Sequence, residues 1–466
     1  MALHEVYRFE NRLIEKNGHL CWDMEGLVQN VIEGLKAAHD AGYTPTTVGI
    51  DTWAVDFLLL DADGTPIGDP VAYRDGRTAA MREELEPILP FTKLYARTGI
   101  QYQSFNTVYQ LCALKKEHPE QLAAAEHFLM VPDYLNYRLT GVMANEYTNA
   151  STTALVGAIS KDWDDEIINR LGLPRKIFGR ISTPGTKLGN LSSAVKDYVG
   201  FDCTVVLPAT HDTGSAFLAV PARDDKAVYL SSGTWSLLGV ENKDPITTPA
   251  SMQANFTNEG GYEYRYRYLK NIMGLWMIQS IRRELNGVSY VEGKDTHQQT
   301  DEDELPPFTH EAIEWGFPDL IAHAKEADSF EAHVNVNDDR FLAPDSMIDE
   351  IRRACFETGQ DVPQTVGQLM RCVYVSLSSC YAESIAEMAS LTGRTYTSIN
   401  IVGGGCQDAY LNELTTRACG IPVFAGPVEG TSLGNLAVQM IADGAFPDLQ
   451  SVRDAIATSF DVKRFE

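Results

Sequence analysis

Residues 205–216 read VVLPATHDTGSA, and the rest of the chain is best interpreted outward from this stretch. Apolar residues that suit a buried strand run into a polar cluster, and an apolar run typical of a helix follows from Gly214. The predicted order is therefore strand, polar turn and helix start. Asp212 belongs to the polar cluster, at the helix end where the dipole is positive and favours an ionised carboxylate.

Two roles are open for Asp212. An ionised carboxylate at this place can accept a proton from a hydroxyl group or help to hold a metal ion. Alternatively, Asp212 or Thr213 simply caps the helix, and the local residues favour this simpler interpretation. The choice between the two roles depends on motifs elsewhere in the chain.

The composition is that of an ordinary globular protein. A chain of 466 residues is too long for one core and predicts two or three domains. Its 44% hydrophobic and 22% charged residues exclude a disordered chain. The formal net charge of -26 argues against nucleic acid and anionic membranes as partners. An anionic ligand would therefore need local donors and a metal ion.

The sequence shows no targeting signal, and its cysteines follow no known motif. No apolar run is long enough to cross a bilayer, and residues 1–13 lack the hydrophobic core of a signal peptide, so the cytoplasm is the expected location. The eight cysteines contain no C-x-x-C, which argues against a zinc site and a disulfide framework. Most are expected to be reduced packing residues, although Cys355 and Cys372 flank a polar loop and could pair.

Strands and helices alternate on both sides of residues 205–216, which predicts an α/β chain. Residues 3–9 are predicted to form a strand, and Asp23 is predicted to cap a helix that Gly42 ends. The pattern restarts after the central stretch, so the chain is predicted to form two α/β domains. Their expected ranges are residues 1–217 and 218–466.

Two further segments of the second half are predicted from their patterns. Residues 287–330 are polar and acidic and are expected to form a surface insertion. A long helix is predicted from about residue 364 to residue 391, because apolar residues recur at helical spacing until Gly393.

Two short motifs have the residue types of a phosphate or nucleotide site. The glycines of residues 403–405 lie between a predicted strand and helix, where backbone N–H groups can approach a nucleotide or simply form a tight turn. Residues 231–234 (SSGT) could cradle phosphate oxygens or form a hairpin turn. The chain has neither a G-x-x-x-x-G-K-[ST] loop nor the protein-kinase signatures, which excludes those two classes.

Two motifs have residues that suit a sugar. Residues 49–53 (GIDTW) place an acid and an indole at a predicted strand end, where the indole could pack on a sugar or, more simply, in the core. Asn271 precedes an apolar helix and is either its N-cap, which the local pattern favours, or a ligand of sugar hydroxyls. Neither motif is decisive alone.

Taken together and in this order, eleven phrases resemble the FGGY carbohydrate kinases over about residues 3–445. The phrases are GIDTWAVDF, PVAYRDGRT, PDYLNYRLTG, EYTNAS, ATHDTGSA, YLSSGTWSLLG, TNEGG, LKNIMGLW, NDDRF, IVGGGCQ and GPVEGTSLGN. The resemblance implies two actin-like (ribonuclease H-like) ATPase domains with sugar and ATP between them. KNIMGLW, NDDRF and GPVEGTSLGN resemble the subgroup that phosphorylates L-rhamnulose at its 1-hydroxyl in L-rhamnose catabolism, with ATP and Mg²⁺.

The resemblance also assigns roles to single residues of this chain. Asp212 corresponds to the proton acceptor and is the candidate ligand of Mg²⁺, with His211 and Thr213 beside it on the sugar. Asn271 matches a sugar-binding asparagine. Thr234, Gln279 and Gly404 match positions that contact ATP. A monomer or small homo-oligomer is expected.

The chain departs from the family pattern at two places. The family begins with a β-hairpin whose acidic residue, glycine and Ser/Thr wrap the ATP phosphates, and the printed sequence is expected to lack this hairpin. Ala54 stands where the motif usually has a glycine that contacts the sugar. Three alternatives follow: a non-catalytic sugar- or nucleotide-binding remnant, a sibling kinase for xylulose or fuculose, and a nicotinamide-dependent oxidoreductase suggested only by the glycine triplet.

Overall fold

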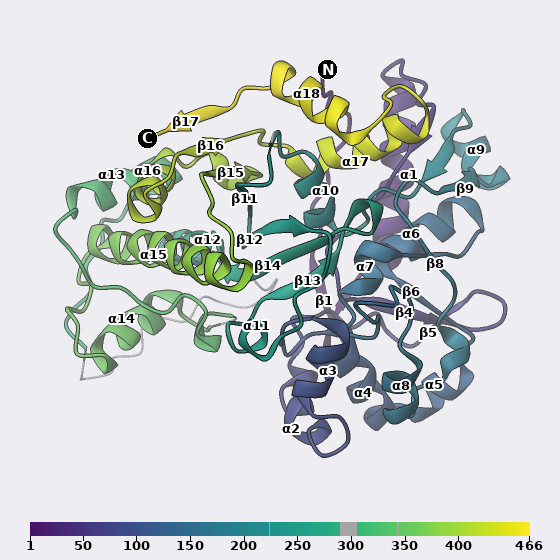
Figure 1. Cartoon of the computed structure of the whole chain (residues 1–466), viewed down its shortest axis with the longest axis horizontal. Coiled ribbons are helices and arrows are strands. Elements are labelled where there is room, and N and C mark those ends of the chain that lie inside the picture. Colours follow the sequence, from purple (N-terminus) through teal and green to yellow (C-terminus); the bar gives the residue numbers. More distant parts are fainter. Residues whose placement is uncertain (223, 289–304, 343) are drawn as a thin grey trace. The chain divides into compact units, whose positions relative to one another are not determined.

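The computed structural model describes residues 1–222, 224–288, 305–342 and 344–466 (Figure 1). Backbone contacts divide the chain into two compact units, each made of segments that are distant in sequence. Unit 1 comprises Met1–Pro221, Val240–Leu269 and Glu429–Asp461, and unit 2 comprises Ala222–Gly239, Lys270–Val428 and Val462–Glu466. The proposed domain boundary at residue 217 stays a prediction.

The central stretch of the sequence forms the predicted strand, turn and helix within unit 1. Strand β10 (Thr204–Val206) leads through a buried turn into helix α10 (Asp212–Leu218). β10 is the middle strand of a three-stranded sheet, parallel to β3 (Thr47–Val48) and antiparallel to β9 (Lys187–Asn190). The prediction for residues 205–216 is confirmed, and the parallel pairing brings the end of β3 beside the turn.

The beginning of the chain differs from the prediction. Residues 3–9 are not a strand: a strand needs a neighbour for its backbone groups, and no described strand pairs with them. The first strands are instead β1 (Leu13–Lys16) and β2 (His19–Trp22), which form an antiparallel hairpin. Asn17 and Gly18 join them with positive φ angles of 52° and 84°, as a tight two-residue hairpin turn requires.

The first helix forms as predicted. Helix α1 (Met24–Asp40) begins at Asp23, whose carboxylate accepts a hydrogen bond of 3.0 Å from Gly26 N. It ends before Gly42, which has φ of 86°.

Strand β4 (Phe57–Leu60) follows, fully buried, between antiparallel partners β5 (Pro66–Ile67) and β6 (His127–Met130). The other elements of unit 1 are η1 (Gly76–Thr78), α2 (Met81–Leu85), α3 (Phe91–Thr98), α4 (Thr107–Glu117), α5 (Pro119–Ala124), α6 (Val131–Thr140), β7 (Asn145–Glu146), α7 (Tyr147–Ser151), α8 (Asp165–Arg170), η2 (Arg175–Ile177), β8 (Ile181–Ser182), α9 (Ser193–Val199), α11 (Pro249–Gln253), β13 (Thr257–Gly260), η3 (Tyr262–Tyr264), α17 (Gly430–Ala442) and α18 (Leu449–Ser459).

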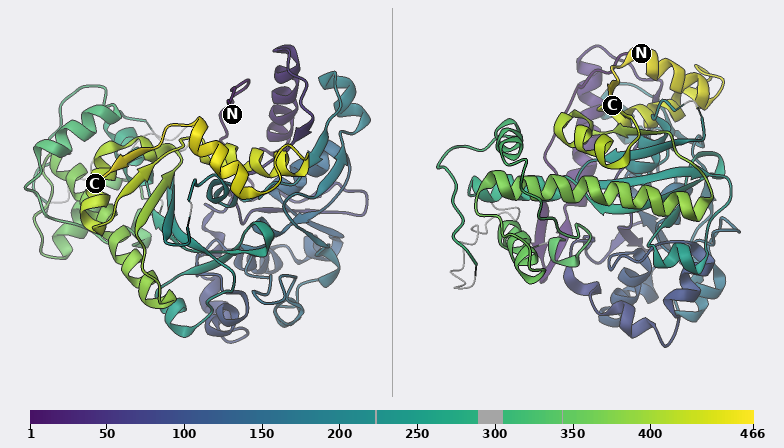
Figure 2. Two further views of the ribbon diagram at one scale, coloured as in Figure 1. Left: turned by 45° about the horizontal axis from the view of Figure 1, so that its top comes forward. Right: turned by 60° about the vertical axis from the view of Figure 1, so that its left-hand side comes forward.

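Unit 2 is built on strands and one long helix. β11 (Ala227–Ser232) pairs antiparallel with β12 (Trp235–Asn242) and parallel with β15 (Ser398–Val402), and β16 (Val423–Ala425) and β17 (Lys463–Phe465) continue the sheet. The predicted long helix is confirmed as α15 (Val366–Thr392), continuous in Figure 2 and followed by Gly393 with φ of 67°. The chain passes between the units within β12 and β14 (Tyr266–Met273). The other elements of unit 2 are α12 (Trp276–Leu285), α13 (Phe317–Glu326), η4 (Asp339–Phe341), α14 (Met347–Glu357), η5 (Gly404–Gln407) and α16 (Ala409–Cys419).

The predicted surface insertion, residues 287–330, is only partly within the described chain. Residues 289–304 lie outside the described residues. The remainder includes α13, and Trp315 and Leu320 are buried, so this part packs into unit 2 and the prediction is wrong for it. An acidic composition concealed the few apolar residues that anchor the helix.

Candidate active site

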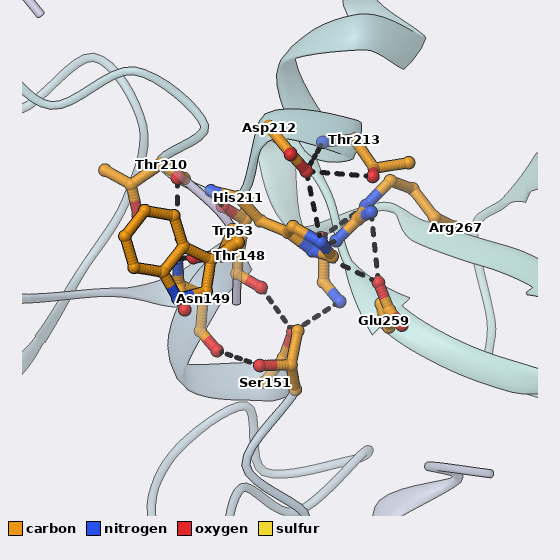
Figure 3. A network of polar contacts seen from close by, with 12 residues as sticks. Trp53, Thr148, Asn149, Ser151, Thr210, His211, Asp212, Thr213, Glu259 and Arg267 are labelled. Carbon is orange, nitrogen blue, oxygen red and sulfur yellow. Dashed lines mark hydrogen bonds and ion pairs between the residues drawn. The ribbon is translucent and has the colours of Figure 1, made fainter. Parts of the chain in front are cut away.

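The turn before α10 and the end of β3 lie side by side in unit 1. Thr52 N donates to Thr210 O at 2.9 Å, and Asp212 N donates to Thr52 O at 2.9 Å. This short parallel pairing joins two motifs that are separated by about 160 residues in the sequence, GIDTW and ATHDT. The candidate site is therefore built where two adjacent strands end, and Trp53 lies next to the turn (Figure 3).

Asp212 is the first residue of α10 and does not act as its N-cap. The capping position is held by His211, which makes no side-chain capping bond, so the simpler interpretation of this stretch is wrong. The Asp212 carboxylate accepts from Thr213 N at 2.6 Å and from Thr213 Oγ1 at 3.0 Å. Its side chain is 45% exposed, so it keeps oxygen atoms available to a ligand.

A buried charged group lies behind His211. The Arg267 and Glu259 side chains are 1% and 6% exposed, and they face each other across the β13–β14 hairpin. Arg267 Nη1 and Glu259 Oε2 are 3.1 Å apart, an ion pair without the alignment of a hydrogen bond. Burial alone would raise the pKa of Glu259, but Arg267 and His211 outweigh it and hold that pKa below its ordinary value.

Both charged residues reach the same imidazole nitrogen. Arg267 Nη2 lies 3.0 Å from His211 Nδ1, and Glu259 Oε2 lies 3.2 Å from it (Figure 3). This nitrogen accepts from the guanidinium in one tautomer and donates to the carboxylate in the other. On the opposite side of the ring, His211 Nε2 lies 3.5 Å from Asp212 Oδ1. His211 is thus fixed from behind and presents one nitrogen toward Asp212.

The Trp53 indole is held by a buried acid. Asp56 Oδ2 accepts from Trp53 Nε1 at 3.0 Å and from Trp22 Nε1 at 2.7 Å, and the two indole rings are 4.1 Å apart. Asn149 Nδ2 donates to Trp53 O and to Thr210 O, both at 3.4 Å. Ala54 follows directly and is partly buried. The GIDTW motif, whose residues suit a sugar, is therefore held by these hydrogen bonds and lies beside the turn.

Asp51 places a second carboxyl group near Asp212. Its Oδ2 accepts from Asn435 Nδ2 at 2.5 Å. Burial and the nearby Asp212 charge raise the pKa of Asp51, the Asn435 amide opposes them, and the result is a pKa of about 7. Asp51 is therefore largely protonated below neutral pH, whereas an ordinary aspartate ionises near pH 4.

Replacing Asp51 by asparagine is expected to change the pH dependence of stability. Between about pH 4 and pH 7 an unfolded aspartate is ionised while the folded Asp51 still holds its proton, so the wild type loses stability as pH rises. A three-unit shift corresponds to about 4 kcal/mol, and we expect about 2 kcal/mol because the side chain is partly exposed. Urea unfolding should show Asp51→Asn more stable at pH 7.5 and equal at pH 4. A difference that does not vary with pH would contradict the expected protonation.

The residues matched to ATP contacts gather in unit 2. Leu275 N donates to Gly233 O and Trp276 N to Thr234 O, both at 3.1 Å, so the SSGT turn holds the start of α12. Gln279 lies one helical turn further along α12. Thr234 and Gln279 are thus carried by one connected piece of structure, as a shared ligand would need.

The glycine triplet lies against the same turn. Gly403 has φ of 89°, and a Cβ there would be 2.8 Å from Ser232 O. A Cβ on Gly405 would overlap Ser232 Oγ, whereas one on Gly404 would enter open space. The close approach of the two backbones explains two of the glycines, and Gly404 is left facing the open side.

Three other predictions can be placed. Asn271 lies on β14 in unit 2, so its assignment to the same sugar as His211 stays a prediction. Cys355 and Cys372 are free buried thiols whose sulfur atoms are 3.8 Å apart. Within the described ranges, no three His, Cys, Asp or Glu side chains converge as metal ligands, and no helix has the length and hydropathy to cross a membrane.

Comparison with solved structures shows the fold. The structure resembles a gluconate kinase from Lactobacillus acidophilus with a TM-score of 0.75 at 16% identity, covering 98% of this chain and 87% of that one. It resembles the glycerol kinase of Plasmodium falciparum with a TM-score of 0.74 at 14% identity, covering 98% and 88%. The fold is therefore that of a two-domain, actin-like carbohydrate kinase, as predicted.

The chain belongs to the FGGY family of carbohydrate kinases, whose N-terminal domain matches residues 4–219 and whose C-terminal domain matches residues 228–442. It is a carbohydrate kinase, and kinases of this family transfer phosphate from ATP to a sugar. A protein named rhamnulokinase from Halalkalibacterium halodurans is 47% identical over 465 residues, covering 100% of this chain and 94% of that protein. Another rhamnulokinase, from Oceanobacillus iheyensis, is 45% identical over 99% of this chain and 92% of its own length. The predicted resemblance is confirmed.

Proposed function

We propose that this kinase transfers the γ-phosphoryl group of ATP to the 1-hydroxyl of L-rhamnulose. The observation that carries the proposal is the likeness, over nearly the whole chain, to three proteins named rhamnulokinase at 40–47% identity. Of the residues assigned to the sugar, Asn271 lies in a phrase that resembles that subgroup, KNIMGLW. Phosphorylation of another ketose, such as xylulose or fuculose, would require the residues assigned to the sugar to bind a different pattern of hydroxyl groups.

Asp212 is the proton acceptor in this proposal. Its carboxylate is half-exposed, lies at the N-terminal end of α10 and accepts hydrogen bonds from Thr213. Phosphoryl transfer needs mainly positioning and charge stabilisation, so a weak base suffices to take the hydroxyl proton. His211, Thr213 and the Ala54 backbone would bind the sugar in unit 1, and Asn271 would bind it in unit 2.

The nucleotide would bind to unit 2 at Thr234, Gln279 and Gly404. Mg²⁺ fits the donor set if one carboxylate, Asp212, holds it together with phosphate oxygens and water, because this ion keeps most of its water and needs no cluster of protein ligands. When bound, the ion neutralises charge on the phosphates.

An ADP-release assay over a panel of ketoses tests the proposed substrate. L-rhamnulose is expected to have the highest kcat/KM. A preference for xylulose or fuculose would move the assignment to a sibling kinase, and binding of a sugar without any turnover would indicate a non-catalytic remnant.

Replacing Gly404 by alanine should separate nucleotide binding from folding. A methyl group there meets no described atom, so the melting temperature should equal that of the wild type, while KM for ATP should rise about tenfold as the approach of the backbone to the nucleotide is blocked. Gly405→Ala is the contrasting variant, because its methyl group would overlap Ser232 and destabilise the fold. An unchanged KM for ATP in Gly404→Ala would contradict the assignment of this glycine.

A further inference from the structure

Glu146 occupies an unusual place for its residue type. It ends β7 and is the N-cap of the five-residue helix α7, and its side chain is fully buried. The carboxylate accepts from Thr148 N at 2.9 Å, from Thr148 Oγ1 at 2.5 Å and from Asn149 N at 3.3 Å. Serine, threonine, aspartate and asparagine are the preferred N-caps, so capping alone does not explain a buried glutamate.

The additional length of Glu146 lets it reach a second segment. The same carboxylate accepts from Thr210 N at 3.1 Å and from Thr210 Oγ1 at 2.7 Å. It therefore bridges α7 and the turn that carries Asp212, and its partner Thr210 lies 64 residues further along the chain. Burial raises the pKa of Glu146, and the donors on Thr148 and Thr210 oppose that rise.

Three successive backbone amides of the turn donate hydrogen bonds to Glu146, Thr148 and Thr52. Thr210 N binds the Glu146 carboxylate, and His211 N donates at 3.2 Å to Thr148 Oγ1, whose own proton points to Glu146. Asp212 N binds Thr52 O at 2.9 Å. Two of these three bonds depend on Glu146, directly or through Thr148. The position of the backbone that presents the Asp212 carboxylate thus depends on Glu146.

We propose that Glu146 is a positioning residue for phosphoryl transfer, which fixes the Thr210–Asp212 turn and thereby the place of the proton acceptor. The inference rests on the proposed function in one respect, that Asp212 accepts the proton. Glu146 itself does not touch the reacting atoms. A displacement of about 1 Å at a catalytic group can cost about 100-fold in rate, so loss of the bridge should be visible in kcat.

Glu146→Asp separates the bridge from the cap. Aspartate is a preferred N-cap and can still serve α7, but a side chain one methylene shorter draws back from Thr210. The matched control is Asp164→Glu, which changes by one methylene the buried carboxylate that caps α8 through Glu166 N and Ile167 N. Asp164 bonds to Arg97, Glu166 and Ile167 and, within the described part of the chain, makes no hydrogen bond to the turn, so this variant tests the effect of altering a buried cap elsewhere in unit 1.

For Glu146→Asp we expect kcat to fall about 100-fold, with KM for ATP unchanged because the proposed nucleotide residues lie in unit 2. Asp164→Glu should keep the kcat of the wild type. Site-resolved hydrogen exchange should also show faster exchange at the Thr210 and His211 amides in Glu146→Asp only. The assay uses whichever ketose the wild type turns over.

The outcomes distinguish this proposal from the proposed function. If Glu146→Asp keeps both the kcat and the amide protection of the wild type, Glu146 is only a helix cap and the proposal is overturned. An equal loss of kcat in Asp164→Glu would also overturn it, because the effect would then be general destabilisation. If the wild type turns over no ketose but the exchange result holds, the role of Glu146 in fixing the turn stands and the proposed function fails.

Discussion

Asp212→Asn is expected to lower kcat for L-rhamnulose by about 1,000-fold, since general-base catalysis contributes roughly 100- to 10,000-fold. Asparagine has nearly the same shape, and its carbonyl oxygen can still accept from Thr213 N as the carboxylate does at 2.6 Å. It has no tendency to take up the hydroxyl proton at neutral pH. The loss should therefore appear in kcat, measured by ADP release, while sugar affinity measured by calorimetry stays close to that of the wild type.

The matched control for Asp212→Asn is Asp197→Asn, which makes the same change on the exposed face of α9. This variant should keep full activity. If Asp212→Asn retained a kcat within about threefold of the wild type, a proton acceptor at this position would be excluded. A loss of sugar binding together with kcat would instead indicate that Asp212 mainly orients the sugar.

Arg267→Leu is expected to destabilise the protein by about 3–5 kcal/mol, because removing one partner of a buried ion pair leaves the other charge unpaired. Arg267 is 1% exposed, and it also donates from Nε to Gly260 O at 3.0 Å. Its loss would leave the Glu259 carboxylate, 6% exposed, with His211 as its remaining partner in the group described above. Urea unfolding measures the change in the free energy of unfolding.

A double variant distinguishes loss of the ion pair from loss of packing. Arg267→Leu combined with Glu259→Gln should recover much of the stability, since no uncompensated carboxylate is left in the interior. Lys116→Met is the surface control: it removes an ion pair to Glu84 in which the side chains are 61% and 43% exposed, and should cost less than about 1 kcal/mol. If Arg267→Leu cost no more than Lys116→Met, the buried pair would contribute little to stability.

Local patterns in the sequence predicted much of the backbone. The strand, turn and helix around Asp212, the Asp23 cap of α1 and the end of α15 at Gly393 each follow from residue types within one short segment. The same local pattern led to the wrong capping interpretation of Asp212. An aspartate at the N-cap and an aspartate at the first helical position differ by one residue in where the helix begins. Helix boundaries are rarely predictable to that precision.

The early strands show a different limit. Residues 3–9 have strand-like composition, but strand formation depends on a partner elsewhere, and the Asn17–Gly18 turn was the better signal in this region. Each unit is assembled from segments that are distant in sequence, and this too depends on contacts that a local pattern does not contain. Contacts such as Asn435 with Asp51 join positions 384 residues apart, which no local pattern reveals.

The candidate site was predicted only in part for the same reason. ATHDT and GIDTW were recognised singly, and their pairing through Thr52 follows from the register of β3 beside β10. The sequence analysis did not identify Glu259 and Arg267. Their opposite charges face each other across a short hairpin, and this pairing can be recognised only when the register of the two strands is known. Glu146 was part of a recognised phrase, EYTNAS, but its partner Thr210 becomes apparent only in three dimensions.

The position of the transferred phosphate tests the central claim most directly. The phosphorus-31 NMR spectrum of a reaction with ATP and L-rhamnulose is expected to show ADP and one new phosphomonoester signal. That signal should be split into a triplet, because the first carbon of this sugar is a primary alcohol carbon with two hydrogens, whereas each secondary alcohol carbon carries one. A doublet would place the phosphate on another hydroxyl, and the absence of any new ester would contradict the proposed reaction altogether.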